Sequence, residues 1–197
     1  MSEYIQKIEN MLANNNGIIT ANEVRSAGIS PSYLSQMMWD GKVYRVGRGL
    51  YALYHVDVDE MYELFWGYKD IVFSHMSALW LHGLIDRTPS VMTVTVTCAR
   101  NTRKLLETGL AEFKRSTKQT HSIGLTQMSS PSGYPIPVYN MERTVCDVVK
   151  AQNQIDPQVL RGALTRYAQR EDKNPARLAQ YAKALKAEEL LREYGLL

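Results

Sequence analysis

The chain has 197 residues, of which 45% are hydrophobic and 22% charged, and its formal net charge is +3. This composition is typical of a soluble globular protein with one or two domains. No run approaches the ~18 apolar residues of a membrane span, and the N-terminus lacks the features of a signal peptide. We therefore expect a cytoplasmic protein without a membrane partner, in which Cys98 and Cys146 are reduced thiols.

Two helices are predicted at the start of the chain. Ile5, Ile8 and Leu12 have helical spacing and form the apolar stripe of the first. Thr20 and Glu23 have the spacing of a capping box, which predicts the start of a second, short helix.

A turn and a third helix complete a helix-turn-helix pattern. Gly28 supplies the tight turn. Ser30 is a suitable N-cap, and Pro31 follows at the first helical position. We expect this helix to run to about Asp40 and to stop at Gly41.

The third helix has two different faces. Leu34, Met37 and Met38 have the spacing of a buried face. Small hydroxyls, an amide and one phenol lie elsewhere on the helix: Ser32, Tyr33, Ser35 and Gln36. Such a polar surface can enter the major groove of DNA, so these four residues are our candidates for base contacts.

A basic β-hairpin is predicted directly after this helix. Its tip is the Gly-Arg-Gly sequence at residues 47–49, and Lys42, Arg45 and Arg48 are candidates for contacts with phosphates or a minor groove. Residues 1–55 carry five basic and four acidic side chains, so the region is only mildly positive. The alternative is a winged helix that serves protein contacts alone, because fold does not fix function.

We place a domain boundary near residue 55, which separates a DNA-binding domain (1–55) from a C-terminal domain (56–197). The second domain opens with an amphipathic helix whose expected buried side carries Tyr62, Phe65 and Trp66.

The C-terminal domain is predicted to be α+β, with a small, mostly antiparallel sheet and helices before and after it. The run from Val91 to Thr97 alternates apolar residues with threonine, which predicts a half-buried strand. The other expected strands are at 71–73, 111–116 and 123–128, with an edge strand around 136–138. Ser74 is expected to cap a helix.

The last third of the chain is predicted to be helical. Asn140, Asp156-Pro157 and Asn174-Pro175 are start signals for three helices. The sequence does not fix where the third of these helices ends, and Tyr194 is the furthest end that we expect.

Catalytic and metal-binding patterns are not evident. The sequence has no Gly-rich phosphate loop, no paired CxxC and no HExxH, and the spacing of His75, His82 and the two cysteines matches no usual zinc site. Arg143 and Asp147, at i and i+4, are expected to form an ion pair, and Ser74 and Ser77 to sit at a helix start. We therefore expect no enzyme, no cofactor and no metal. An enzymatic alternative would use Glu142, Asp147, His75 and His82.

A second set of basic residues lies outside the winged helix and has two interpretations, a solvated face or an extension of a DNA-binding surface. These residues are Arg100, Arg103, Lys104, Lys114, Arg115, Arg161 and Arg166.

Taken together, these motifs resemble the AbiEi antitoxins of bacterial abortive-infection systems. The resemblance is carried by the Gly-Ile-Ser turn at 28–30, the hairpin at 41–51, the Ser-Ala-Leu and His-Gly-Leu sequences within 74–84, the strand at 91–97 and the Glu-Arg-Thr and Asp residues within 139–147.

The resemblance implies a winged helix that binds inverted repeats in its own promoter, two copies at a time, and represses transcription. It also implies a C-terminal domain that counters a nucleotidyltransferase-like toxin without a stable complex, as in type IV systems of phage defence. In that interpretation the motifs at 74–84 and 142–147 are structural. A rival hypothesis is a module that docks directly on its toxin.

Overall fold

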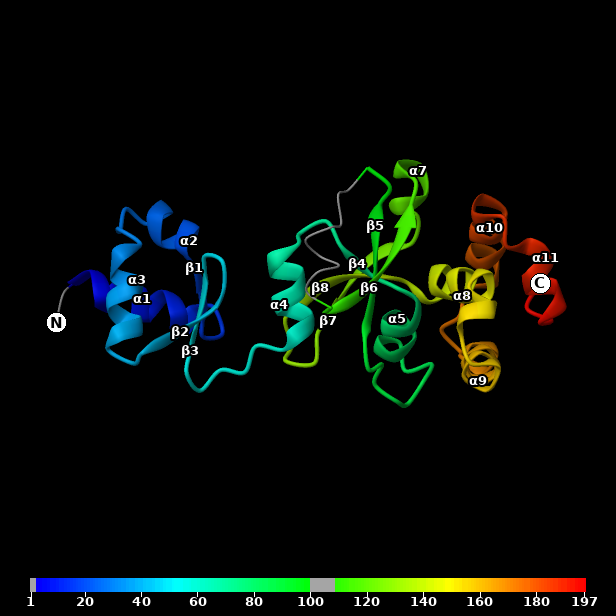
Figure 1. Cartoon of the computed structure of the whole chain (residues 1–197), viewed down its shortest axis with the longest axis horizontal. Coiled ribbons are helices and arrows are strands. Elements are labelled where there is room, and N and C mark those ends of the chain that lie inside the picture. The colour runs from blue at the N-terminus through cyan, green and yellow to red at the C-terminus, as the bar shows by residue number, and fades with distance from the viewer. Residues whose placement is uncertain (1–2, 100–108) are drawn as a thin grey trace. The chain divides into compact units, whose positions relative to one another are not determined.

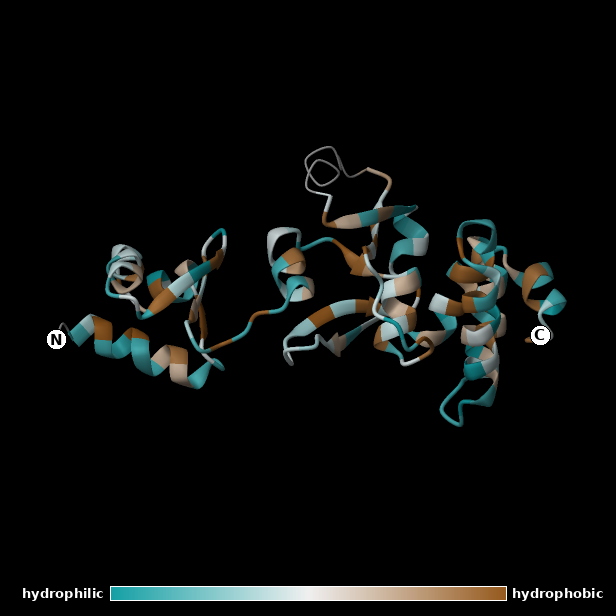
Figure 2. Ribbon diagram, turned by 60° about the horizontal axis from the view of Figure 1, so that its bottom comes forward, coloured by the Kyte–Doolittle hydropathy of each residue, from teal (hydrophilic) through white to brown (hydrophobic). Residues whose placement is uncertain are grey.

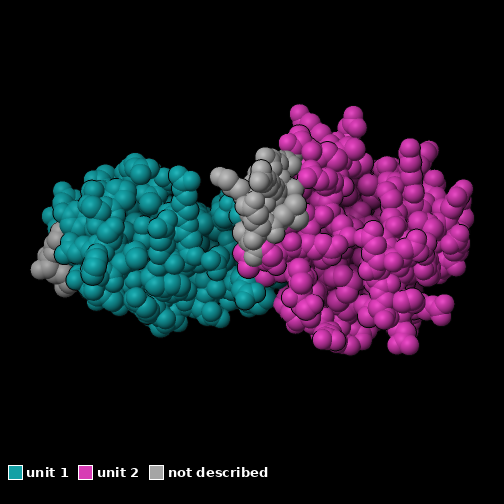
Figure 3. Space-filling model, in the orientation of Figure 1, with its two compact units in different colours: residues 1–69, 131–134 teal, residues 70–130, 135–197 magenta. Residues whose placement is uncertain are grey.

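A computed structural model describes residues 3–99 and 109–197. The chain divides into two compact units, residues 1–69 with 131–134, and residues 70–130 with 135–197 (Figure 3). The first unit extends past the predicted boundary at residue 55. The reason is that the helix after the hairpin contacts the first strand of that hairpin. The division of roles between residues 1–55 and 56–197 stays a prediction.

The first unit contains the predicted helix-turn-helix and hairpin together with one strand that we did not predict. Its sheet is antiparallel, with the order β1-β3-β2 (Figure 1). The elements in chain order are α1 (Glu3–Asn14), β1 (Ile18–Thr20), α2 (Ala21–Ser26), α3 (Ser32–Trp39), β2 (Val43–Gly47), β3 (Leu50–Leu53) and α4 (Glu60–Gly67).

The core of this unit forms because each helix contributes one apolar face. The predicted stripe of α1 is buried, and its apolar residues appear as brown bands between teal ones in Figure 2. Leu34 and Met37 are buried beneath α3, while Met38 packs at the edge of the same core. On α4 the buried residues are Met61, Tyr62 and Leu64, whereas the expected Phe65 and Trp66 are only half-buried.

The local signals around α2 and α3 are confirmed with one correction. The Thr20 hydroxyl accepts from the Glu23 N–H at 3.0 Å, and the Glu23 carboxylate accepts from the Thr20 N–H at 2.7 Å. Gly28 has φ +75°, as a turn glycine requires. However, α3 begins one residue later than expected, with Pro31 at the N-cap position and the Ser30 hydroxyl accepting from the N–H of Ser32 at 3.4 Å.

The second unit is built on a five-stranded sheet of order β6-β5-β4-β8-β7. The sheet is mixed: β4–β5 and β7–β8 pair antiparallel, and β4–β8 and β5–β6 pair parallel, which is more parallel pairing than expected. The elements are β4 (Val72–Phe73), α5 (His75–Leu81), β5 (Met92–Thr97), β6 (Ala111–Ser116), α7 (Lys118–His121), β7 (Leu125–Ser129), β8 (Pro135–Tyr139), α8 (Met141–Lys150), the 3-10 helix η1 (Gln152–Gln154), α9 (Pro157–Gln169), α10 (Pro175–Leu185) and α11 (Glu188–Glu193).

Two strands differ from their predictions because of their neighbours. Strand β5 is not half-buried: Thr93 and Thr95 are buried as completely as the valines, since α5 packs on the strand. Strand β8 is not an edge strand but lies between β4 and β7. Its two prolines are tolerated because β4 pairs with it only at Val138.

The C-terminal helices begin where the cap signals predict. The side chains of Asn140, Asp156 and Asn174 all accept hydrogen bonds from the first turns of α8, α9 and α10. Helix α10 ends at Leu185 because Lys186 adopts a left-handed conformation (φ +57°), and α11 follows as a separate helix. No helix in the described ranges has both the length and the apolar character needed to cross a membrane.

Candidate nucleic-acid interface

The outer face of α3 carries most of the residues predicted to contact bases. Ser32, Ser35 and Gln36 are exposed, as a groove-reading surface requires. Tyr33 is half-buried, packs against the core, and its ring lies 5.4 Å from that of Tyr4. Tyr33 therefore shapes the N-terminal end of this face more than it projects from it.

Trp39 completes the exposed face and was missed by the sequence reasoning. It is 91% exposed, an unusual position for so large an apolar side chain. It follows Ser32 by seven residues, Ser35 by four and Gln36 by three, so all four share one side of the helix. This spacing was visible in the sequence, but a tryptophan at the end of a helix is more often buried.

The three basic side chains predicted on the wing differ in the contacts that they make. Lys42 forms an ion pair with Glu9 of α1, with 2.6 Å between Nζ and Oε1. The Arg45 Nε donates to the Gly47 carbonyl at 3.2 Å, which leaves the outer nitrogens of its exposed guanidinium available. The exposed Arg48 side chain makes no hydrogen bond or ion pair within the described residues.

Helix α4 braces the tip of the wing. The Trp66 Nε1 donates to the Arg48 carbonyl at 3.1 Å. The Lys69 ammonium lies 3.5 Å from the centroid of the Trp66 ring and 4.3 Å from that of Phe65. Burial among these rings lowers the pKa of Lys69. The hydrogen bond fixes the backbone from which the Arg48 side chain projects.

Of the second set of basic residues, three of the four that the structure describes are engaged in local contacts. The Lys114 Nζ lies 2.6 Å from the Glu112 Oε1. Arg166 forms a bidentate ion pair with Asp86, in which Nη1 donates to Oδ1 at 2.8 Å. The Arg115 Nη1 donates to the Cys98 carbonyl. Arg161 is exposed and has no partner within the described ranges, while Arg100, Arg103 and Lys104 lie outside them.

The serines and histidines around α5 serve the fold. Although α5 starts after Ser74 as predicted, the Ser74 hydroxyl does not cap it; it accepts instead from the Thr95 hydroxyl at 2.8 Å. The Ser77 hydroxyl accepts from the Thr93 N–H, also at 2.8 Å. The His82 Nε2–H donates to the Tyr139 carbonyl at 2.7 Å, and burial lowers the pKa of this histidine.

The Glu-Arg-Thr and Asp residues of α8 form a buried network. The predicted ion pair is confirmed, because the Arg143 Nε lies 3.0 and 2.9 Å from the two Asp147 oxygens. The Arg143 Nη1 donates to the Ile123 carbonyl at 2.9 Å. Glu142, 1% exposed, accepts from the Asn174 N–H and so joins α8 to the start of α10.

The enzymatic candidates are only partly brought together. His82 and Glu142 line a cavity of about 410 Å³ whose other charged groups are already paired, Arg170 with Asp172 and Arg177 with Glu142. His75 and Asp147 are not part of its lining. Burial raises the pKa of the Cys146 thiol to about 12, which leaves it unreactive. The described part of the chain holds no group of three or more His, Cys, Asp or Glu side chains suited to a metal.

Helices α1–α3, the antiparallel sheet and the glycine-tipped hairpin of the first unit define a winged helix-turn-helix domain. Residues 6–54 match the family model for "Transcriptional regulator, AbiEi antitoxin". The winged helix therefore belongs to the AbiEi family of antitoxin transcriptional regulators, as the sequence motifs indicated. For the residues beyond 54 the resemblance stays a prediction.

One solved structure extends the comparison to the rest of the fold. The chain is similar to the crystal structure of the RV2827C protein from Mycobacterium tuberculosis, with a TM-score of 0.61 and 14% sequence identity. The alignment covers 99% of this chain and 78% of that one. At this identity the likeness shows a shared fold and nothing further. No curated protein matched the sequence.

Proposed function

We propose that this protein binds inverted repeats in the promoter of its own operon as a repressor, and that it is the antitoxin of a type IV system of phage defence. The observation that carries the DNA-binding role is the exposed polar face of α3 beside a wing with two accessible arginines, in a segment that matches antitoxin transcriptional regulators. The cytoplasm is the compartment in which such a regulator meets DNA. In this proposal it needs no catalytic residue, cofactor or metal.

The wing and the helix have different tasks in this proposal. Arg45 and Arg48 contact phosphates or the minor groove and set the register, while Ser32, Ser35 and Gln36 read base edges in the major groove. Two copies on an inverted repeat place their α3 helices about 34 Å apart, or at a multiple of that spacing.

The test is a gel shift with DNA from directly upstream of this protein's gene. We expect specific binding by the parent chain and its loss when Arg45 and Arg48 are both changed to alanine. Lys183→Ala with Arg192→Ala removes the same charge from exposed positions on α10 and α11 and serves as the matched control. Specific binding that survives in the wing variant, or fails in the parent at moderate salt, contradicts the assignment.

The antitoxin role is tested separately by expression with a nucleotidyltransferase-like toxin encoded beside it. We expect growth to be restored without a stable complex, and restoration to persist in the Arg45→Ala, Arg48→Ala variant, because the two roles belong to different parts of the chain. Co-purification of toxin and antitoxin as a stable pair would favour the rival hypothesis of a docking module.

A further inference from the structure

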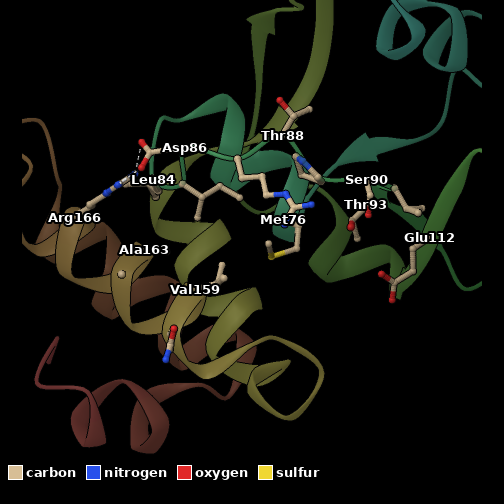
Figure 4. A pocket seen from close by; sticks show the side chains of 16 residues that line it. Met76, Leu84, Asp86, Thr88, Ser90, Thr93, Glu112, Val159, Ala163 and Arg166 are labelled. Atoms are coloured by element: carbon tan, nitrogen blue, oxygen red, sulfur yellow. Dashed lines mark hydrogen bonds and ion pairs between the residues drawn. The ribbon is translucent and has the colours of Figure 1, made fainter.

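The second unit contains a cavity that none of the roles above uses. It has a volume of about 690 Å³, within the range of roughly 300–1,000 Å³ typical of small-molecule sites. Figure 4 shows its lining side chains, which come from α5 and the segment after it, from α9 and from strands β5 and β6. Met76, Leu84, Val159 and Ala163 give it an apolar wall.

Helix α9 has a glycine in its middle turn, on the side that lines this cavity. Gly162 lines the cavity, and glycine within a helix costs about 1 kcal/mol relative to alanine. A Cβ built on Gly162 would meet no atom within 4 Å, so close helix packing does not explain the glycine. Gly162 is exposed, and the absence of a side chain leaves open space beside it at the cavity.

A threonine hydroxyl at the cavity wall makes no hydrogen bond to the described residues. Thr93 is 2% exposed and lines the cavity, and its hydroxyl makes no hydrogen bond within the described residues. Thr95, two residues further along β5, donates to Ser74. The Thr93 hydroxyl can therefore donate to, or accept from, a polar atom of a molecule in the cavity.

The charges around the cavity favour an anion. Its two acidic residues are already neutralised, Asp86 by Arg166 and Glu112 by Lys114. Arg87 also lines the cavity and makes no ion pair or hydrogen bond within the described ranges. A guanidinium in this state matches a carboxylate, which it can bind through two parallel hydrogen bonds.

We propose that this cavity binds a small amphipathic carboxylate, with its apolar body against Met76, Leu84 and Val159 and its carboxylate at Arg87. The site lies within the second unit and is independent of the α3 surface proposed for DNA.

The experiment is isothermal titration of the full chain with octanoate, and with octylammonium as a probe of equal length and opposite charge. We expect saturable binding of octanoate at one site per chain and at least tenfold weaker binding of octylammonium. Equal or tighter binding of octylammonium, or no saturable binding of octanoate up to millimolar concentration, overturns the proposal.

Two variants locate the site. Gly162→Met fills the cavity from α9 and should abolish octanoate binding without lowering the melting temperature, because methionine is the better helix former. Arg87→Gln should weaken octanoate binding about tenfold, whereas Arg161→Gln, which removes an exposed charge beside Gly162 outside the cavity, should leave it unchanged. Octanoate binding that persists unchanged in both the Gly162 and Arg87 variants overturns the assignment.

Discussion

Trp39 is the side chain whose position in this protein most calls for an explanation. A large apolar side chain exposed to water is typical of an interaction site, because binding a partner removes its apolar surface from water. It shares the face of α3 with polar side chains, which favours a partner with both apolar and polar groups over a purely apolar one. A DNA major groove has this character, because thymine methyl groups lie among the hydrogen-bonding edges.

We predict that Trp39→Ala weakens specific binding to the operator by about 10-fold or more and leaves non-specific binding nearly unchanged, since the indole contacts bases and not phosphates. Competition gel shifts with operator and unrelated DNA measure this ratio. Tyr54→Ala removes an aromatic ring that is 63% exposed outside α3 and is the matched control. A Trp39 variant with the parent's specificity ratio contradicts the prediction.

His75 is a second residue with an unusual environment. Burial and the charges of Lys114 and Arg143 lower its pKa to about 3. The unfolded chain therefore binds a proton near pH 6.5 that the folded chain does not, so stability falls as pH drops from about 6.5 toward 3.

We predict that His75 alone lowers the free energy of unfolding by up to about 1.4 kcal/mol for each pH unit below 6.5. Urea unfolding at pH 7.0, 6.0 and 5.0 measures it. His75→Asn should make the pH dependence shallower, because asparagine does not titrate and tolerates the positive φ of 48° at this position. The control is His55→Asn, at an exposed histidine in the other unit. Equal slopes for the parent and His75→Asn would contradict the assignment.

At the scale of elements, α8 is the helix that holds the second unit together. Its buried Arg143 joins three parts of the fold through Asp147, the Ile123 carbonyl and the face of the Tyr139 ring, 4.2 Å away. The backbone at Gly124 also passes close to Arg143. This explains the glycine, because a Cβ there would lie 2.5 Å from the Arg143 Cβ. This accounts for the Glu-Arg-Thr and Asp sequence without catalysis.

We predict that Arg143→Met destabilises the chain by about 3–5 kcal/mol, because it leaves the Asp147 carboxylate buried and unpaired. Adding Asp147→Leu should recover part of this loss, since no stranded charge remains. Chemical unfolding of both variants and the parent gives the comparison. A double variant that is less stable than Arg143→Met alone would contradict this prediction. It would mean that the Asp147 carboxylate stabilises the fold through a group other than Arg143.

The wing depends on α4 in a similar way. We predict that Trp66→Phe, which keeps an aromatic ring beside Lys69 but loses the bond to the Arg48 carbonyl, costs about 1 kcal/mol of stability. It should also weaken DNA binding several-fold, because the wing tip is less well fixed. Thermal unfolding and gel shifts measure the two effects. Phe65→Leu, a neighbouring change that keeps this hydrogen bond, should leave DNA affinity near the parent value.

For the whole molecule, the number of basic side chains available to phosphates determines how steeply DNA affinity falls with salt concentration. The net charge is only +3, and several basic side chains outside the winged helix are already paired. The wing offers Arg45 and Arg48 in each copy, while Lys42 is held by Glu9. The winged helices of two copies should therefore contact about four phosphates through these residues.

We predict a slope near −4 for the logarithm of operator affinity against the logarithm of salt concentration, at about −0.9 per phosphate. Fluorescence anisotropy between 50 and 300 mM salt measures it. Arg115→Ala with Arg161→Ala should leave the slope unchanged. A slope of −7 or steeper that becomes shallower in this variant would instead extend the DNA surface into the C-terminal basic residues.

The sequence by itself determined the features that are local. The capping box at Thr20, the turn at Gly28, the glycine-tipped hairpin and the cap-and-proline starts of the late helices depend on contacts within a few residues, so their patterns were readable. The ion pair between Arg143 and Asp147 is one helical turn long and was predictable for the same reason.

Tertiary structure alone decided what depends on neighbours distant in the chain. Strand β5 is buried on both faces because α5 covers its threonines, and β8 is interior because β4 and β7 flank it. The exposure of Trp39 and the open space beside Gly162 depend on what does not pack against them. Local periodicity records which side of an element is apolar, and packing determines whether another element covers it.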